Sequence, residues 1–125
     1  MAPPIPLPKY VYKITPSPPP SPLPESYPAS DLDARDGFIH LSTAAQIPVT
    51  AGLFFAGDAA IWVIKVRLGP HLAAATRWED SLPGCPHLHG RSFGRADIEG
   101  VAEFRREGGG DWAEVLGREG KGFLE

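Results

Sequence analysis

Chemically useful side chains occur first in the stretch DGFIHLSTAAQ, residues 36–46, where His40 stands in an apolar segment two residues before Ser42. Alternate residues of an extended strand share a face, so Phe38, His40 and Ser42 are expected to point the same way. A histidine in such a segment must satisfy two ring nitrogens or lose free energy on burial, and imidazole titrates near neutral pH. The stretch therefore predicts either a ligand-facing general acid or base, or a structural histidine bonded to a carbonyl and a hydroxyl.

A second histidine-bearing stretch is CPHLHG, residues 85–90. His87 and His89 are two residues apart, so they lie on one side of the chain if it is extended. Cys85 continues the same parity, but one His-x-His pair is a weak signal for zinc, and we expect no metal. We predict that His40, His87 and His89 are the catalytic residues, acting as proton donors and acceptors without a cofactor.

The expected ligand-binding residues flank these histidines. A helix beginning at Ser42 or Thr43 would offer free backbone N–H groups that favour an anion. In the RWED stretch, Arg77 and Glu79 share one face of a strand, where they either form an ion pair or flank a pocket. An arginine fork suits a carboxylate or a phosphate. The predicted substrate-binding residues are Ser42, Thr43, Arg77, Glu79 and Phe38.

Composition restricts the class of protein. With 125 residues, 42% hydrophobic and 22% charged, the chain fits one globular domain. A net charge of −3 gives no electrostatic reason to expect nucleic acid. The single cysteine cannot form an internal disulfide, and no signal peptide or apolar run of about 18 residues indicates secretion or a membrane span. We expect a cytoplasmic protein; its oligomeric state is not indicated.

The order of elements predicts an α+β domain at 9–107, preceded by a proline-rich arm at 1–8 and followed by a glycine-rich tail at 108–125. Strands are expected at 9–15, 37–42, 60–67, 75–80 and 97–107. The strand at 60–67 is apolar on both faces and is therefore expected to be central.

The remaining stretches are expected to be helical or irregular. Pro48 should divide the helix that starts at Ser42 or Thr43 into a short turn and a second helix. We expect a turn at 69–72, a loop at 81–94, and a tail that forms one weak helical turn around Trp112 and Val115 and then frays.

Proline is concentrated in the first 28 residues, as in PSPPPSPLPESYP. Such segments favour extended polyproline conformations and act as stiff, solvated connectors. They leave open a third function, an interaction scaffold whose N-terminal prolines bind a proline-recognising domain.

Four stretches together, YVYKIT, DGFIHLSTAAQ, TRWED and PHLHG, resemble the family of domains of unknown function numbered 952 (DUF952) over residues 9–105. The resemblance implies a fold similar to ADP-ribosyltransferases: a small split, mostly antiparallel sheet with one main helix around a cleft. His40-Leu41-Ser42 then occupies the comparable place to the motif that holds the ribose of NAD, with Glu99 and Glu103 as the only candidates for a catalytic glutamate. The family pattern Phe-Pro-His-Leu-Tyr-Gly is altered here, because Cys85 replaces the Phe and His89 replaces the Tyr.

These observations favour a small cofactor-independent enzyme that binds a compact polar or anionic metabolite in a histidine-lined cleft. Acid/base chemistry there would support isomerisation, cyclisation, dehydration or hydrolysis, including tailoring of secondary metabolites. The alternatives are a non-catalytic module for a nucleotide-like or anionic small molecule and an NAD-dependent ADP-ribosyl transferase.

Overall fold

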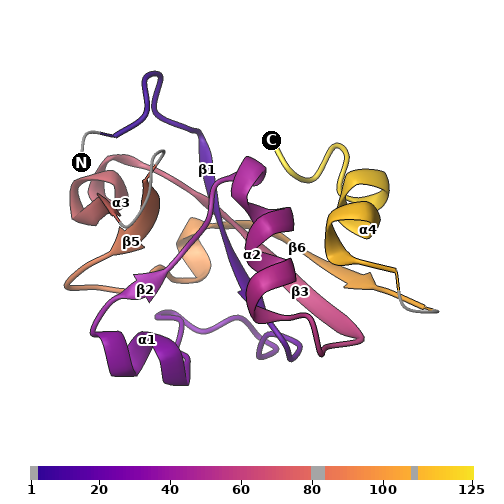
Figure 1. Ribbon diagram of the computed structural model, residues 1–125. Coiled ribbons are helices and arrows are strands. Elements are labelled where there is room, and N and C mark those ends of the chain that lie inside the picture. Colours follow the sequence, from indigo (N-terminus) through magenta and orange to yellow (C-terminus); the bar gives the residue numbers. More distant parts are fainter. Residues whose placement is uncertain (1–2, 80–83, 108–109) are drawn as a thin grey trace.

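The computed structural model describes residues 3–79, 84–107 and 110–125, and within them the strands form two antiparallel sheets (Figure 1). The first sheet has the order β1-β3-β6, with β1 at Tyr10–Thr15, β3 at Ala60–Arg67 and β6 at Ile98–Arg105. The second has the order β2-β5-β4, with β2 at Ile39–His40, β5 at Cys85–Leu88 and β4 at Thr76–Glu79. The α-helices are α1 (Asp31–Asp36), α2 (Ile47–Phe54), α3 (Pro70–Ala75) and α4 (Trp112–Glu119), with 3₁₀ turns η1 (Ala44–Gln46) and η2 (Arg95–Asp97). The predicted α+β class is confirmed.

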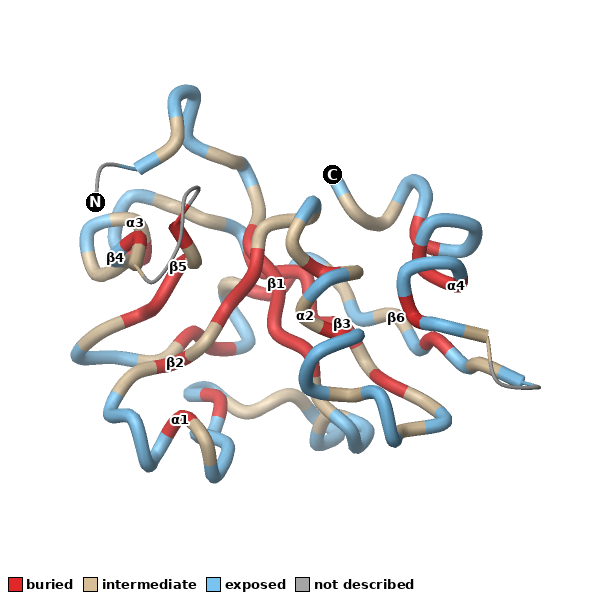
Figure 2. Tube along the Cα trace, viewed as in Figure 1, coloured by how far each residue is buried: buried red, intermediate tan, exposed pale blue. Residues whose placement is uncertain are grey.

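Strand β3 is the central strand of the first sheet, as its sequence predicts, and its two faces enter different hydrophobic clusters. Ile64 and Val66 pack with Trp78, Leu88 and Phe93, among others, whereas Ile61 and Val63 pack with α2 and α4 residues. Buried residues follow β1 and β3 through the middle of the molecule (Figure 2). This strand therefore separates a cluster next to the second sheet from a cluster under the two longer helices.

Tyr12 of β1 connects the two sheets through its backbone. Its N–H donates to the Ser42 carbonyl at 2.8 Å, and the Ser42 N–H donates back to the Tyr12 carbonyl at 2.9 Å. The strand predicted at 37–42 is regular only over β2. Leu41 donates to the Pro86 carbonyl at 3.0 Å, but proline has no N–H to return, so regular pairing ends at His40.

Several predicted elements are wrong in type. Residues 85–88 of the expected loop form β5, because they pair with β2 on one side and with β4 on the other. The local sequence, with Pro83 and Gly84, predicted a loop instead. The expected turn at 69–72 belongs mostly to α3, which begins at Pro70, a favourable first helical residue. Residues 80–83 lie outside the described part of the chain. Pro48 does separate η1 from the longer helix, lying in the first turn of α2.

The C-terminal segment packs on the sheet rather than fraying. Asp111 caps α4 by accepting from the Glu114 N–H at 2.7 Å, and Trp112, Val115 and Leu116 are buried. The expectation of one main helix is also wrong, since α2 and α4 have equal length. No helix in the described ranges has the length and apolar character that a bilayer crossing requires.

Helix α1 is fixed to the first sheet by an ion pair that solvent barely reaches. The Lys13 ammonium on β1 lies 2.6 Å from Asp33 Oδ2, and their side chains are only 8% and 1% exposed. The Ser30 hydroxyl caps α1 by accepting from the Asp33 N–H at 3.1 Å, and Gly37 ends the helix at a left-handed φ of 83°. Burial by itself would raise the pKa of Asp33, but Lys13 and hydrogen bonds from Lys13 and His40 outweigh it, so this pKa lies below its usual value.

Replacing Trp112 by alanine should lower the free energy of unfolding by about 3–5 kcal/mol, because it removes a buried indole. It also removes the indole N–H donated to the Phe55 carbonyl at 2.7 Å. Urea unfolding followed by circular dichroism measures the loss. Leu53→Ala, at a side chain on α2 that is largely exposed, is the control and should stay within about 0.5 kcal/mol of wild type. A loss below about 1 kcal/mol for Trp112→Ala would contradict the packing of α4.

Replacing Asp33 by asparagine should lower the free energy of unfolding at pH 7 by about 3 kcal/mol, since it leaves the Lys13 ammonium buried without its counter-charge. A carboxylate with a depressed pKa stabilises the fold above the pKa of the unfolded chain, about 4, and loses that effect as pH falls. The difference from wild type should therefore shrink in acid. Asp31→Asn, at an exposed carboxylate in the same helix, should leave the pH dependence of the free energy of unfolding unchanged. An equal effect of both variants would refute the stabilising role of the Lys13–Asp33 ion pair.

Candidate functional site

Three histidines, His40 from one part of the chain and His87 and His89 from another, meet around Phe38. In the pairing of β2 with β5, His40 stands opposite His87, and their ring centroids are 5.2 Å apart. The Phe38 ring lies 4.4 Å from the His87 ring, 4.7 Å from that of His40 and 4.8 Å from that of His89. We call Phe38, His40, His87, His89 and Glu79 the histidine cluster. All five are residues that the sequence proposed for catalysis or substrate binding.

Glu79, the last residue of β4, holds two of the imidazoles. Its Oε1 lies 2.8 Å from Nε2 of His89 and 3.0 Å from Nδ1 of His87. Hydrogen bonds from His89 and then from His87 lower the pKa of Glu79, so its carboxylate stays ionised near neutral pH. Because an ionised carboxylate only accepts, each contact requires a proton on that ring nitrogen.

The two imidazoles on Glu79 differ in exposure. The His87 side chain is 4% exposed and that of His89 is 25% exposed. With Nε2 of His89 donating to Glu79, the other nitrogen, Nδ1, is the basic one in the neutral ring. His89 is therefore the member of this pair that is suited to exchange protons with a ligand.

His40 has a different environment, between two carboxylates of α1. Its Nδ1 lies 2.7 Å from Asp33 Oδ1, and its Nε2 lies 3.0 Å from Asp36 Oδ2. Both contacts become hydrogen bonds at once only when the ring carries two protons. Asp33 is buried and Asp36 is partly exposed, so the Nε2 side is the one that opens toward solvent. The two carboxylates therefore fix the orientation of the His40 ring.

Arg77 lies next to this cluster but is not bound to it. It stands opposite His87 in the pairing of β4 with β5, and it makes no hydrogen bond or ion pair with any residue that the structure describes. Arg77 and Glu79 both line a cavity of about 370 Å³ along β4, which Pro3 and Leu7 of the N-terminal arm also border. Glu79 thus contacts the imidazoles and also lines a hollow with Arg77, whose guanidinium has no partner among the residues that the structure describes.

Ser42 and Thr43 are engaged elsewhere. The Ser42 hydroxyl is buried and lies 3.2 Å from the hydroxyl of Thr50 on α2. The Thr43 N–H, expected to favour an anion, donates to Gln46 Oε1 at 3.0 Å. Ser42 therefore contacts α2 and Thr43 stands at the start of η1, and no described contact joins either residue to the imidazoles.

Sequence reasoning did not identify Lys13, Asp33 and Asp36 as site residues. A signal for the two aspartates was present, since Ser30-x-x-Asp33 is a capping-box pattern and Gly37 a helix stop, which together predict α1 just before His40. Lys13 had no local signal, because its partner is on another element. Within the described ranges, no group of three or more His, Cys, Asp or Glu side chains could hold a metal ion.

Three solved structures of protein CC0527 from Caulobacter crescentus are similar to this chain. The crystal structure shares 27% identity, covers 82% of this chain and 91% of that chain, and has a TM-score of 0.63. The solution NMR structure also shares 27% identity and has a TM-score of 0.66. Its match covers 88% of this chain and 95% of that chain. A crystal structure of a double mutant of the same protein gives a TM-score of 0.64.

No curated protein matches the sequence. A family model does match, and it spans residues 22–101, more than half of the 125 residues. The chain therefore belongs to the family described as "Protein of unknown function (DUF952)".

Proposed function

We propose that this protein is a small cofactor-independent enzyme that binds a compact polar metabolite with an anionic group and transforms it by acid/base chemistry. Isomerisation, cyclisation, dehydration and hydrolysis all fit. The observation that carries the proposal is the position of Glu79, which hydrogen-bonds His87 and His89 and also lines a cavity with the uncommitted Arg77. That cavity, at about 370 Å³, has a volume usual for small-molecule sites.

The two kinds of imidazole environment support separate acid and base roles. His89, oriented by one carboxylate and partly exposed, acts as the base through Nδ1. His40, held between Asp33 and Asp36, acts as the acid. A pair of titratable groups in unlike environments is the arrangement that acid/base enzymes use. Arg77 binds the anionic group of the substrate through its fork, and Phe38 fixes the rings.

A non-catalytic binding module is the second candidate, and the burial of His87 favours it. A ring that is 4% exposed and held by Glu79 suits fixed recognition better than proton exchange. In that case the same cavity would bind a nucleotide-like or other anionic small molecule without turnover.

NAD-dependent ADP-ribosyl transfer is a further alternative, together with the finer fold assignment, ADP-ribosyltransferase-like. Two small antiparallel sheets that meet at Tyr12 and Ser42 support that assignment. Against the reaction, Glu99 and Glu103 lie on β6 of the other sheet, in ion pairs with Arg67 and Arg105. We place the protein in the cytoplasm, which agrees with a sequence whose one cysteine cannot form an internal disulfide.

The enzyme proposal predicts proton exchange between solvent and a bound metabolite. Small 2-hydroxy and 2-keto acids incubated with the protein in D₂O should show deuterium incorporation by NMR for at least one compound. His89→Gln should reduce the rate of exchange about 100-fold and change the affinity less than about threefold. Arg77→Met should instead weaken binding about 10-fold or more, because it removes a charge-assisted hydrogen-bond donor.

His71→Gln and Arg91→Met are the matched controls. His71 is bound to Asp97 at 2.9 Å, outside the histidine cluster, and Arg91 is exposed, so neither should alter exchange or affinity. If acids bind in a way that depends on Arg77 but no compound exchanges or reacts, the binding module replaces the enzyme. If none of the acids binds, both the enzyme proposal and the binding-module proposal for this cavity are refuted.

A further inference from the structure

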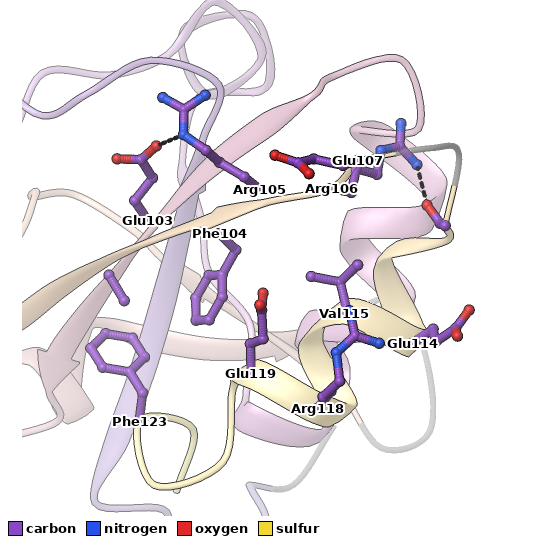
Figure 3. A pocket seen from close by; sticks show the side chains of 12 residues that line it. Glu103, Phe104, Arg105, Arg106, Glu107, Glu114, Val115, Arg118, Glu119 and Phe123 are labelled. Carbon is purple, nitrogen blue, oxygen red and sulfur yellow. Dashed lines mark hydrogen bonds and ion pairs between the residues drawn. The ribbon is translucent and has the colours of Figure 1, made fainter.

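Strand β6 has an open edge on the side of the first sheet away from β3. Within the described residues it pairs with β3 alone. Beyond it lies a cavity of about 1130 Å³ between residues 102–107 and α4. Figure 3 shows Phe104, Val115 and Phe123 facing the interior of this cavity, with charged side chains around them. The hollow therefore follows the end of β6 from Ala102 to Arg105 and the two residues after it, as an added extended segment would.

The backbone groups on this edge can be assigned by alternation. The Arg106 N–H donates to the Ala59 carbonyl at 3.0 Å, so Arg106, Phe104 and Ala102 direct their backbone groups toward β3. The N–H and C=O groups of residues 101, 103 and 105 consequently face the open edge. Main-chain hydrogen bonds from such an edge give affinity for another strand, and the side chains give specificity.

The charges on the exposed face of this strand alternate in sign. Glu103 and Arg105 are ion-paired with each other, and Figure 3 shows them side by side at the rim of the cavity. Charges on an edge strand ordinarily oppose pairing with another chain. Here the order Glu103-x-Arg105 is self-complementary, because two antiparallel copies centred on Phe104 place each glutamate opposite the arginine of the other copy.

We propose that the occupant of this edge is β6 of a second copy of the same chain. The two strands pair antiparallel about a two-fold axis at Phe104, which is 4% exposed in the single chain, and join two sheets into one. Two cross-strand pairs form between Glu103 and Arg105 of opposite copies, and Val101 faces Glu107. Such a contact is isologous and closed, so it gives a dimer rather than a fibre.

Charge reversal tests the register. Glu103→Arg alone and Arg105→Glu alone place like charges opposite each other, so each should raise the dimer dissociation constant at least about tenfold. The double variant Glu103→Arg/Arg105→Glu restores opposite charges across the axis and should return the constant to within about threefold of wild type. Sedimentation velocity of the full chain over a concentration series up to millimolar measures all four proteins.

Glu99→Arg is the matched control, because it makes the same charge change on the same strand outside the paired stretch 101–107. Thermal melts show whether each variant remains folded. If a single variant unfolds, the dissociation constants of the wild type and the double variant are compared instead. A wild-type protein that stays monomeric at millimolar concentration overturns the proposal. So does a dimer whose dissociation constant responds equally to Glu99→Arg, or does not recover in the double variant.

Discussion

The ion pair between Lys13 and Asp33 fixes the relative positions of β1, α1 and β2. Removing an ammonium and a carboxylate from water costs several kcal/mol per ion unless each is fully hydrogen-bonded. Asp33 meets this condition by accepting from Lys13, from the Ser30 N–H and from both the backbone and the ring of His40. The backbone of His40 also accepts from Lys13 at 3.2 Å. The ring of His40 can therefore occupy few other positions, and the geometry of the histidine cluster depends on a buried pair of charges.

The histidine cluster brings three imidazole rings together, and the positive charge of any protonated ring must be balanced by nearby carboxylates. Imidazolium rings with centroids near 5.2 Å repel one another when more than one is protonated. Within the described part of the chain, the carboxylates of Asp33, Asp36 and Glu79 offset that repulsion. Among the residues that the structure describes, His40 contacts Asp33 and Asp36, whereas His87 and His89 both contact Glu79. In the proposed mechanism, these different carboxylate contacts distinguish His40, the proton donor, from His89, the proton acceptor.

From the sequence, the grouping of the histidines was easier to predict than the strands on which they lie. Alternation in short apolar stretches placed His87 and His89 on one side and identified β3 as central, since those patterns depend on local geometry. Strand β5 was missed because its pairing comes from β2 and β4 on either side, and Pro86 argues against a strand when it is read alone. The end of β2 was misplaced for the same reason, because the Pro86 carbonyl that accepts from Leu41 belongs to a distant part of the sequence. Lys13 as a partner of Asp33 required the tertiary fold.

The region matched by the family model begins at residue 22, beyond the end of β1. A truncated protein limited to residues 22–101 would retain every histidine of the cluster and Glu79, yet it would lack Lys13 and the Tyr12 backbone that pairs with Ser42. Its Asp33 would be buried among neighbours arranged for a cation that is no longer there. Domain boundaries for expression, and alignments used to transfer a role from one relative to another, should therefore include the strand that precedes the shared region.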